Sequence, residues 1–296
     1  MARGEVGHAG GDFEEGVTME DESYKRILTI QDISCVGQCS LTVALPIISA
    51  CGHETCIIPS AVLSTHTGGF TGFTVRDLSS DIPGIAAHWK EEGIDFDAFY
   101  TGYLGSIDQI DMVLDIVSTL GRPGALKMFD PAMGDNGSLY PAFDMDYVEG
   151  MKRLCAQADY VLPNITEAAF LTGMPYRETY DEVYIRELLD KLVEMGSRNV
   201  VLTGVGYREG RTGVVVYEDG EYQYYEHERI AKGCHGTGDV YASAFVGMMM
   251  HGKSTFDAAR IAADYTVESI KCTLGDESHW YGVKFEKALP MLMENL

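Results

Sequence analysis

A glycine-rich turn that runs into an acid is the part of this sequence best suited to chemistry. In HGTGDVYASAFVG, residues 235–247, Gly236 and Gly238 let the backbone turn tightly and approach a ligand. The N–H groups of residues 236–239 would lie at the positive end of the following helix, where they can stabilise an anion. Asp239 could then take a proton from an alcohol that attacks a phosphoryl group. A simple helix-capping role for Asp239 is the alternative that this stretch leaves open.

A second pair of polar residues has the spacing of a cation site. Asn164 and Glu167, in LPNITEA, follow an apolar run and are three residues apart, on one face of the first turn of a helix. Oxygen ligands at that spacing suit a hydrated Mg²⁺, which takes only one or two protein groups. The alternative is that Asn164 caps the helix while Glu167 complements its dipole.

Two further residues carry open alternatives. His66 lies in the polar loop STHTGG, residues 64–69, where contact with a ligand and a structural role are both plausible. Cys234 precedes the glycine-rich turn, and a plain loop cysteine is favoured there over a reactive thiol. The sequence has no GxxxxGK[ST] loop, and its glycine spacing does not fit a dinucleotide fingerprint, so P-loop NTPases and Rossmann dehydrogenases lose their strongest support.

The elements that must position these residues alternate along the chain. Short β-prone runs alternate with longer amphipathic ones, which predicts βαβ units and a mainly parallel sheet in an α/β fold. Strands are expected at 26–31, 54–60, 97–103, 126–131, 159–164 and 198–204, with a hairpin over 211–228 that turns at Asp219-Gly220. Helices are expected at 40–51, 80–92, 107–121, 144–157, 166–173, 181–196, 238–252, 255–273 and 283–294. Ligands of such sheets bind beyond the carboxyl ends of the strands, so the polar residues after each strand should converge.

Composition restricts the class of partner. The chain has 296 residues and a net charge of −23, which disfavours nucleic acid and anionic membranes because both require clustered Lys and Arg. A small-molecule ligand is expected instead. The seven cysteines form an odd set without C-x-x-C spacing, and no secretory signal precedes them, so we expect a reducing cytoplasm. Residues 1–24 are expected to be a flexible acidic tail and residues 25–296 a single domain.

Seven motifs in a fixed order resemble the ribokinase-like superfamily, and within it the pyridoxal kinases. They are IQD at 30–32, STHTGG at 64–69, TGYLGS at 101–106, FDPAMGD at 129–135, PNITEA at 163–168, LTG at 202–204 and GTGD at 236–239. The resemblance implies a three-layer α/β/α fold and ATP-dependent phosphorylation of a hydroxymethyl group of pyridoxal, pyridoxine or pyridoxamine. It also implies Mg²⁺, a monovalent cation such as K⁺, and a homodimer.

Roles for individual residues follow from the resemblance. Asp239 matches the catalytic base, and the backbone of Gly236, Thr237 and Gly238 matches the anion hole. Asp130, Asn164 and Glu167 match the residues that hold Mg²⁺, its waters and the triphosphate, with Asp130 and Glu167 on the metal. Thr203 and Gly204 match the nucleotide loop, and residues 134–140, ending at Tyr140, match a flap over ATP. On the substrate side the matching residues are His66, Thr67 and Tyr103.

Two departures from the pyridoxal kinase pattern affect the expected substrate. Asp32 stands where those kinases usually have a serine that meets the pyridine ring, and an acid there could pair with a protonated ring nitrogen or a cationic substituent. His235 makes the loop HGTGD, and HGTG is also typical of hydroxymethylpyrimidine kinases. Phosphorylation of hydroxymethylpyrimidine is therefore the alternative activity. A protein that binds B6 vitamers without turnover is a third, which the intact GTGD, NITE and FDP motifs disfavour.

Overall fold

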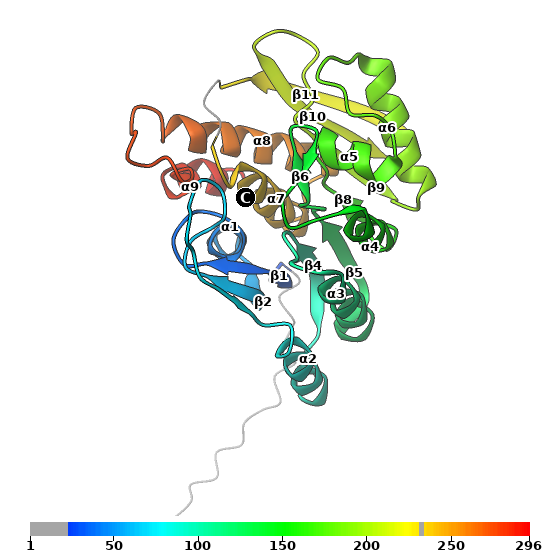
Figure 1. The fold of residues 1–296 in the computed structure, drawn as a ribbon, viewed down its shortest axis with the longest axis vertical. Helices are drawn as coiled ribbons and strands as arrows, with labels where there is room; N and C mark the ends of the chain where they lie inside the picture. Colours follow the sequence, from blue (N-terminus) through cyan, green and yellow to red (C-terminus); the bar gives the residue numbers. More distant parts are fainter. Residues whose placement is uncertain (1–22, 231–233) are drawn as a thin grey trace, which may run out of the picture.

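A computed structural model describes residues 23–230 and 234–296, and most of the tail predicted at residues 1–24 lies outside these ranges. One large sheet contains nine of the strands in the order β11-β10-β9-β8-β5-β4-β1-β2-β3 (Figure 1). The six inner strands, from β9 to β2, pair in parallel, whereas β10, β11 and β3 are antiparallel. The strands of this sheet are β1 (Arg26–Ser34), β2 (Glu54–Leu63), β3 (Val75–Asp77), β4 (Phe96–Thr101), β5 (Gly121–Phe129), β8 (Tyr160–Val161), β9 (Asn199–Thr203), β10 (Arg211–Glu218) and β11 (Glu221–Glu228).

Helices cover both faces of the sheet, which confirms the predicted three-layer α/β/α fold (Figure 1). One face packs against α2 (Ile82–Glu91), α3 (Ile107–Leu120), α4 (Met145–Cys155), α5 (Ile165–Thr172) and α6 (Glu182–Glu194). The other packs against α1 (Leu41–Ala50), α7 (Thr237–Met250), α8 (Thr255–Lys271) and α9 (Phe285–Met293). Every predicted helix is present within three residues of its expected ends. In the described residues, no helix is both long and apolar enough to cross a membrane.

Local sequence signals explain where several elements begin and turn. Ser106 starts α3 by accepting a hydrogen bond from the Gln109 N–H, a standard helix N-cap. Asp219 and Gly220 both have positive φ, as a tight two-residue hairpin between right-twisted strands requires. The predicted hairpin turn is therefore confirmed.

The sequence missed two small strand pairs. The edge strand β3 has only three residues, and its pairing partner β2 extends three residues beyond the predicted end. Within residues 134–140, the segment expected as a flap, the chain forms a two-stranded hairpin of β6 (Gly134–Asp135) and β7 (Ser138–Leu139). Strands of two or three residues carry too few side chains to establish a period of two.

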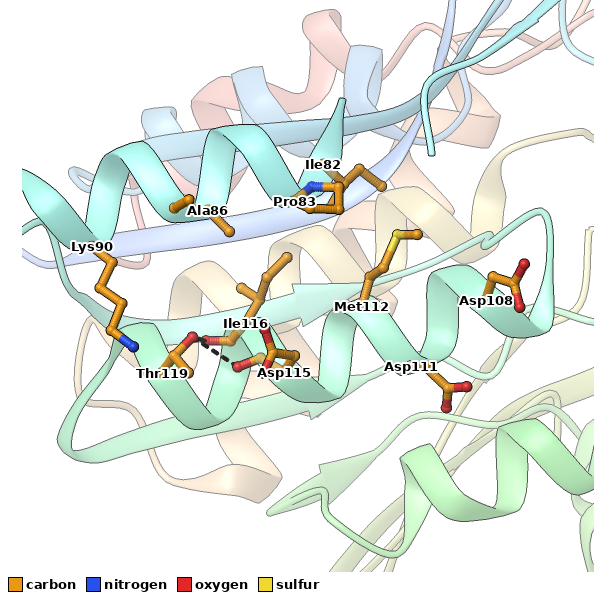
Figure 2. A pocket seen from close by; sticks show the side chains of 11 residues that line it. Ile82, Pro83, Ala86, Lys90, Asp108, Asp111, Met112, Asp115, Ile116 and Thr119 are labelled. Carbon is orange, nitrogen blue, oxygen red and sulfur yellow. Dashed lines mark hydrogen bonds between the residues drawn. The ribbon is translucent and has the colours of Figure 1, made fainter. Parts of the chain in front are cut away.

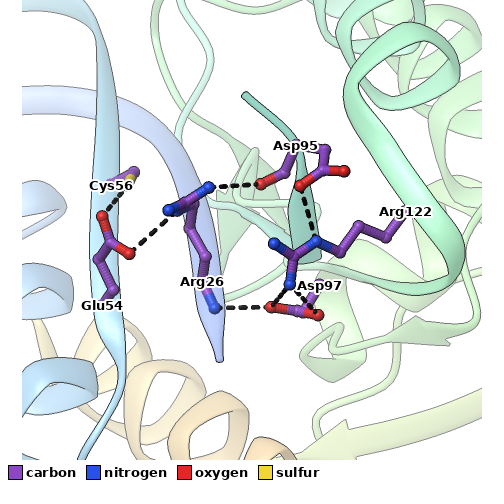
Figure 3. Close-up of polar contacts among 6 residues, drawn as sticks. All are labelled: Arg26, Glu54, Cys56, Asp95, Asp97 and Arg122. Carbon is purple, nitrogen blue, oxygen red and sulfur yellow. Dashed lines mark hydrogen bonds and ion pairs between the residues drawn. The ribbon is translucent and has the colours of Figure 1, made fainter. Parts of the chain in front are cut away.

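The amino ends of the central strands are joined by charged side chains (Figure 3). Arg26 on β1 binds Glu54 on β2 through its guanidinium, at 3.0 Å, and its backbone N–H donates to Asp97 on β4. Arg122 on β5 binds both Asp97 and Asp95. At the amino ends of the strands these charged side chains are paired with one another. A catalytic site is therefore to be sought at the opposite, carboxyl ends.

Candidate active site

The strand order changes direction between β1 and β4, which places a ligand site at their carboxyl ends. After β1 the chain adds β2 on one side, then crosses to add β4, β5, β8 and β9 in succession on the other. Such a switch point leaves a crevice because the two flanking connections diverge to opposite faces of the sheet. Asp32 lies near the end of β1 and Tyr103 directly after β4, and the charge of Asp32 acts on both Tyr103 and Asp239 in the first turn of α7.

The glycine-rich turn approaches the chain near α1 very closely. Gly236 is the N-cap of α7 with φ 75°, and a Cβ atom at this position would lie 1.8 Å from the Gln38 carbonyl oxygen. Only glycine fits both constraints. Beside it, a Cβ added to Gly238 would meet no atom within 4 Å, so this part of the turn faces open space at the start of the helix. The N–H groups of the first turn are therefore placed where they can bind an anion.

Asp239 combines a partly buried position with a carboxyl suited to proton transfer. Burial raises its pKa to about 7, the Ser40 backbone N–H donates to it and lowers the pKa, and the charge of Asp32 raises it. A base works best when its pKa lies near the operating pH. The N-cap residue of α7 is Gly236, and Asp239 stands in the first turn, where its carboxyl accepts from the Ser40 N–H outside the helix. The geometry thus favours the base over the capping role.

Glu167 and Asn164 form a complete capping box at the start of α5. The Asn164 side chain accepts from the Glu167 N–H at 2.9 Å, and the Glu167 carboxylate accepts from the Asn164 N–H at 2.8 Å. The same carboxylate also accepts from the Met133 N–H, and the Asn164 amide donates to the Gly134 carbonyl. The pair therefore caps the helix and at the same time holds the loop that follows β5.

Three acids at the carboxyl ends of the strands have no basic partner among the described residues. Burial, followed by the charges of Glu167 and Asp239, raises the pKa of Asp130 well above its ordinary value. Burial raises the pKa of Glu167 to about 8, although three backbone N–H groups oppose the shift. None of the ion pairs in residues 23–230 and 234–296 includes Asp130, Glu167 or Asp239. Buried carboxylates without a cation of their own fit a bound cation.

The acids do not close into a complete metal cage. Across the part of the chain that the structure describes, no three His, Cys, Asp or Glu side chains lie close enough together to hold a metal ion. Mg²⁺ does not need such a cage, because it keeps several waters and shares phosphate oxygens. The residues present fit a metal that arrives with a nucleotide.

The residues predicted to bind the nucleotide lie close to Asn164 and the acids. Thr203 at the end of β9 pairs with Asn164 in an isolated bridge, and its N–H donates to the Pro163 carbonyl. Gly204 follows with positive φ and accepts from the Tyr180 hydroxyl. Tyr140, 38% exposed, follows the β6–β7 hairpin, and its N–H donates to the Met133 carbonyl.

The hairpin beneath Tyr140 is fastened to α5. The Gly137 N–H donates to the buried Thr166 hydroxyl at 3.0 Å. Through this bond and the contacts of Asn164 and Glu167 with residues 133 and 134, the start of α5 holds the hairpin at its turn and at its first strand, β6.

The predicted substrate residues lie on the other side of Asp239. His66 is 5% exposed, and the backbone engages both of its ring nitrogens: the Gly68 N–H donates to Nδ1, and Nε2 lies 2.6 Å from the Tyr281 carbonyl. Neither ring nitrogen is therefore left to bind a ligand. Thr67 is exposed, and the Tyr103 ring packs at a tilt against Phe143; burial and then the charge of Asp32 raise the pKa of Tyr103.

Sequence reasoning missed Ser40. This residue is 4% exposed, donates its hydroxyl to Asp32 at 2.6 Å, and presents its N–H to Asp239. The sequence suggested only that a helix starts near it. His235, by contrast, is exposed beside His66, with their ring centroids 5.3 Å apart.

A separate groove between α2 and α3 contains none of the predicted site residues (Figure 2). Its floor is apolar, with Ile82, Met112 and Ile116, and acids of α3 rim it. It contains no group of residues suited to proton or phosphoryl transfer.

Comparison with known proteins agrees with this geometry. The model of the family described as phosphomethylpyrimidine kinase matches residues 46–282. A putative phosphomethylpyrimidine kinase from Bacteroides thetaiotaomicron, whose crystal contains pyridoxal, is 37% identical, with a TM-score of 0.86 over 90% of this chain and 95% of that one.

Two pyridoxal kinases are also similar. The structure of the enzyme from Lactobacillus plantarum is 32% identical, with a TM-score of 0.85 over 91% of this chain and 97% of its own. The enzyme from Dictyostelium discoideum is 28% identical over 240 residues, 75% of this chain and 77% of that protein. The resemblance seen in the ordered motifs is confirmed, and the chain belongs to the phosphomethylpyrimidine kinase family, among whose relatives are pyridoxal kinases.

Proposed function

We propose that this chain transfers the γ-phosphoryl group of ATP to the hydroxymethyl group of pyridoxal, pyridoxine or pyridoxamine, giving pyridoxal 5′-phosphate from pyridoxal. The observation that carries the proposal is Asp239, a carboxyl with a pKa of about 7 in the first turn of α7. The reaction needs a base that accepts the hydroxyl proton and donors that stabilise the transferring phosphoryl group. A carboxyl with this pKa would supply the first, and the neighbouring N–H groups would supply the second.

In this mechanism Asp239 accepts the proton of the substrate hydroxyl as its oxygen attacks the phosphorus. The N–H groups of Gly236, Thr237 and Gly238 stabilise the charge on the phosphoryl oxygens, because the open face at Gly238 lets them approach. The Ser40 N–H holds the Asp239 carboxylate in place. Little covalent chemistry is left to the protein, since positioning and electrostatics dominate phosphoryl transfer.

Asp130, Glu167 and Asn164 are the residues that would hold Mg²⁺ and its waters. When bound, Mg²⁺ neutralises the charge of the β- and γ-phosphates. The proposal is supported by the two buried carboxylates, which lack basic partners among the described residues. Thr203, Gly204 and Tyr140 would bind the nucleotide on the same side. Activity should require Mg²⁺. Measuring activity after K⁺ is replaced by Na⁺ tests whether the reaction depends on a particular monovalent cation.

The pyridine ring would lie between Asp32, Tyr103 and the segment of His66 and Thr67. Pyridoxal in the crystal of the Bacteroides thetaiotaomicron relative and the names of the similar pyridoxal kinases support this substrate class. Hydroxymethylpyrimidine is the second candidate, because His235 lies exposed beside the His66 ring and the family itself is named for a pyrimidine kinase.

An assay with purified protein, Mg-ATP and four alcohols separates the two candidates. The alcohols are pyridoxal, pyridoxine, pyridoxamine and hydroxymethylpyrimidine, and the phosphorylated products are quantified by chromatography and mass spectrometry. We expect kcat/KM to be highest for a B6 vitamer. Accumulation of pyrimidine phosphate without any phosphorylated vitamer would reverse the ranking.

A cytoplasmic homodimer is also part of the proposal. Within the described residues, no disulfide is formed by six of the cysteines, which supports a reducing compartment; they are Cys35, Cys39, Cys51, Cys56, Cys155 and Cys272. The dimer rests on the family resemblance, and light scattering coupled to size-exclusion chromatography tests it.

A further inference from the structure

Asp32 is a buried carboxylate whose described partners are all neutral. It is 5% exposed near the end of β1, where the Ser40 hydroxyl donates to one oxygen at 2.6 Å and the Ser34 hydroxyl donates to the other at 3.1 Å. No ion pair within residues 23–230 and 234–296 involves it. A carboxylate in such a place is costly unless a cation pairs with it.

The backbone is strained where it meets this carboxylate. Ser40 has φ 54° and ψ −130°, a conformation that favours glycine, although the residue is a serine. Strain of this kind persists only where the surroundings fix it, and it gathers at functional sites. Here the side chain of Ser40 holds Asp32 while its N–H holds Asp239. One strained residue therefore fixes Asp32 relative to the proposed base.

Among the described residues, none of the groups next to Asp32 carries a positive charge. The groups that interact with it most closely are Ser34, Ser40, His66, Tyr103 and Asp239. Two are hydroxyl groups of serine, one is a phenol and one is an acid. His66 accepts a backbone N–H at Nδ1, so its hydrogen-bond pattern assigns the neutral ring with the proton on Nε2. A carboxylate held by these groups can pair with a cation that a ligand brings.

We propose that Asp32 binds a protonated nitrogen of the substrate, either the pyridinium N–H or an exocyclic ammonium, and thereby selects cationic B6 vitamers. The inference rests on the proposed function, and it adds the residue that determines specificity. Asp32 is suited to this role because both of its oxygens are already fixed by hydroxyl donors, so the carboxylate is oriented before the substrate arrives. Ser40 then sets the distance from the bound ring to Asp239.

The test compares Asp32→Asn and Asp32→Ser with wild type, using kcat/KM for pyridoxamine, pyridoxine and pyridoxal. A charge-assisted hydrogen bond contributes about 1.5–3 kcal/mol, so each variant should lose about 10- to 150-fold, mainly through KM. A loss of kcat/KM for pyridoxamine alone would identify the exocyclic ammonium as the group that Asp32 binds. A loss of kcat/KM for all three vitamers would identify the ring N–H. Asp77→Asn, an exposed Asp on β3, is the matched control and should keep wild-type values.

A second measurement uses wild-type protein, so it does not depend on the folding of a variant. Calorimetry without ATP would compare pyridoxamine with its N-acetyl derivative, and pyridoxine with an analogue whose ring nitrogen is replaced by carbon. One neutral analogue should bind at least about tenfold more weakly than its parent.

Three results would overturn the inference. They are kcat/KM values of both Asp32 variants within twofold of wild type for every vitamer, a loss in kcat with KM unchanged, or equal binding of both neutral analogues and their parents. If wild type phosphorylates only hydroxymethylpyrimidine, the proposed function fails instead. Failure of the inference is seen separately, as vitamer phosphorylation that does not depend on Asp32.

Discussion

Replacing Asp239 by Asn should abolish turnover and yet stabilise the folded protein. The substitution keeps the shape of the side chain, and the amide oxygen can still accept the Ser40 N–H. It removes the negative charge that accepts the proton. General bases contribute about 10²- to 10⁴-fold to rate, so kcat should fall by that factor while substrate binding is largely kept.

The stabilisation follows from the raised pKa of Asp239. The pKa rises from 3.8 to about 7 on folding, so between these values the folded state keeps a proton that the unfolded state has lost. Stability therefore decreases as pH rises through this window, and the full cost is present above pH 7. At 1.36 kcal/mol per pKa unit the upper limit is about 4 kcal/mol, reduced by the partial exposure of the side chain. The Asn variant avoids this cost.

Thermal unfolding at pH 8 and at pH 4 measures the effect. For a chain of this size each kcal/mol corresponds to about 2–4 °C, so the Asn variant should unfold several degrees higher at pH 8 and close to wild type at pH 4. Asp276→Asn is the control, and its effect on stability should have the opposite sign. The Lys284 ammonium, 2.6 Å from the Asp276 carboxylate, holds the pKa of Asp276 below its ordinary value. Losing that ionised carboxylate should lower stability at pH 8.

The pH dependence of wild-type turnover tests the same reasoning independently. Since only the ionised form of Asp239 can accept a proton, kcat/KM should rise with pH and reach half its plateau near pH 7. A midpoint near 4, an Asp239→Asn variant that keeps more than a tenth of wild-type kcat, or one that is less stable than wild type at pH 8 would refute the reasoning.

Two further predictions concern the elements around the site. Gly236→Ala places a Cβ 1.8 Å from the Gln38 carbonyl at positive φ, so it should lower the free energy of unfolding by several kcal/mol in urea titrations; Gly84→Ala, with open space around it, should be neutral or slightly stabilising. Thr166→Val removes the acceptor of the Gly137 N–H and loosens the β6–β7 hairpin, so KM for ATP should rise about three- to tenfold with kcat changed less. An unchanged KM for ATP would exclude the hairpin from nucleotide binding.

The sequence predicted the fold because its long elements repeat with clear periods. Several helices, such as α3 and α6, show an apolar stripe, α7 is apolar and buried on almost all sides, and most of the inner strands are continuous apolar runs that only a covered parallel sheet can bury. The predicted strand over 159–164 is reduced to Tyr160–Val161, because the chain turns at Pro163 into the cap at Asn164. Short strands are set by neighbours in space, which a local pattern does not reveal.

The part of the site that the sequence predicted consists of residues that directly follow strands or open a helix. Asp130, Asn164 and Asp239 each have a local signal of this kind, and parallel strands bring such positions to one edge. Ser40 also opens a helix, but that position gives no sign of its contacts with two acids. Its significance comes from contacts with Asp32, eight residues away, and with Asp239, almost 200 residues away, and from a φ that a serine seldom adopts.

The contacts of Ser40 also explain why an acid can stand at the mouth of a largely buried helix. The Ser40 N–H lowers the pKa of Asp239, while burial and the charge of Asp32 raise it, and the balance leaves the carboxyl near neutrality. A cation bound to Asp32 would remove the repulsion that Asp32 exerts and favour the ionised form of Asp239. Substrate binding would then increase the population of ionised Asp239, which is the form that accepts the proton. The increase would occur in the complex that contains the hydroxyl group to be deprotonated.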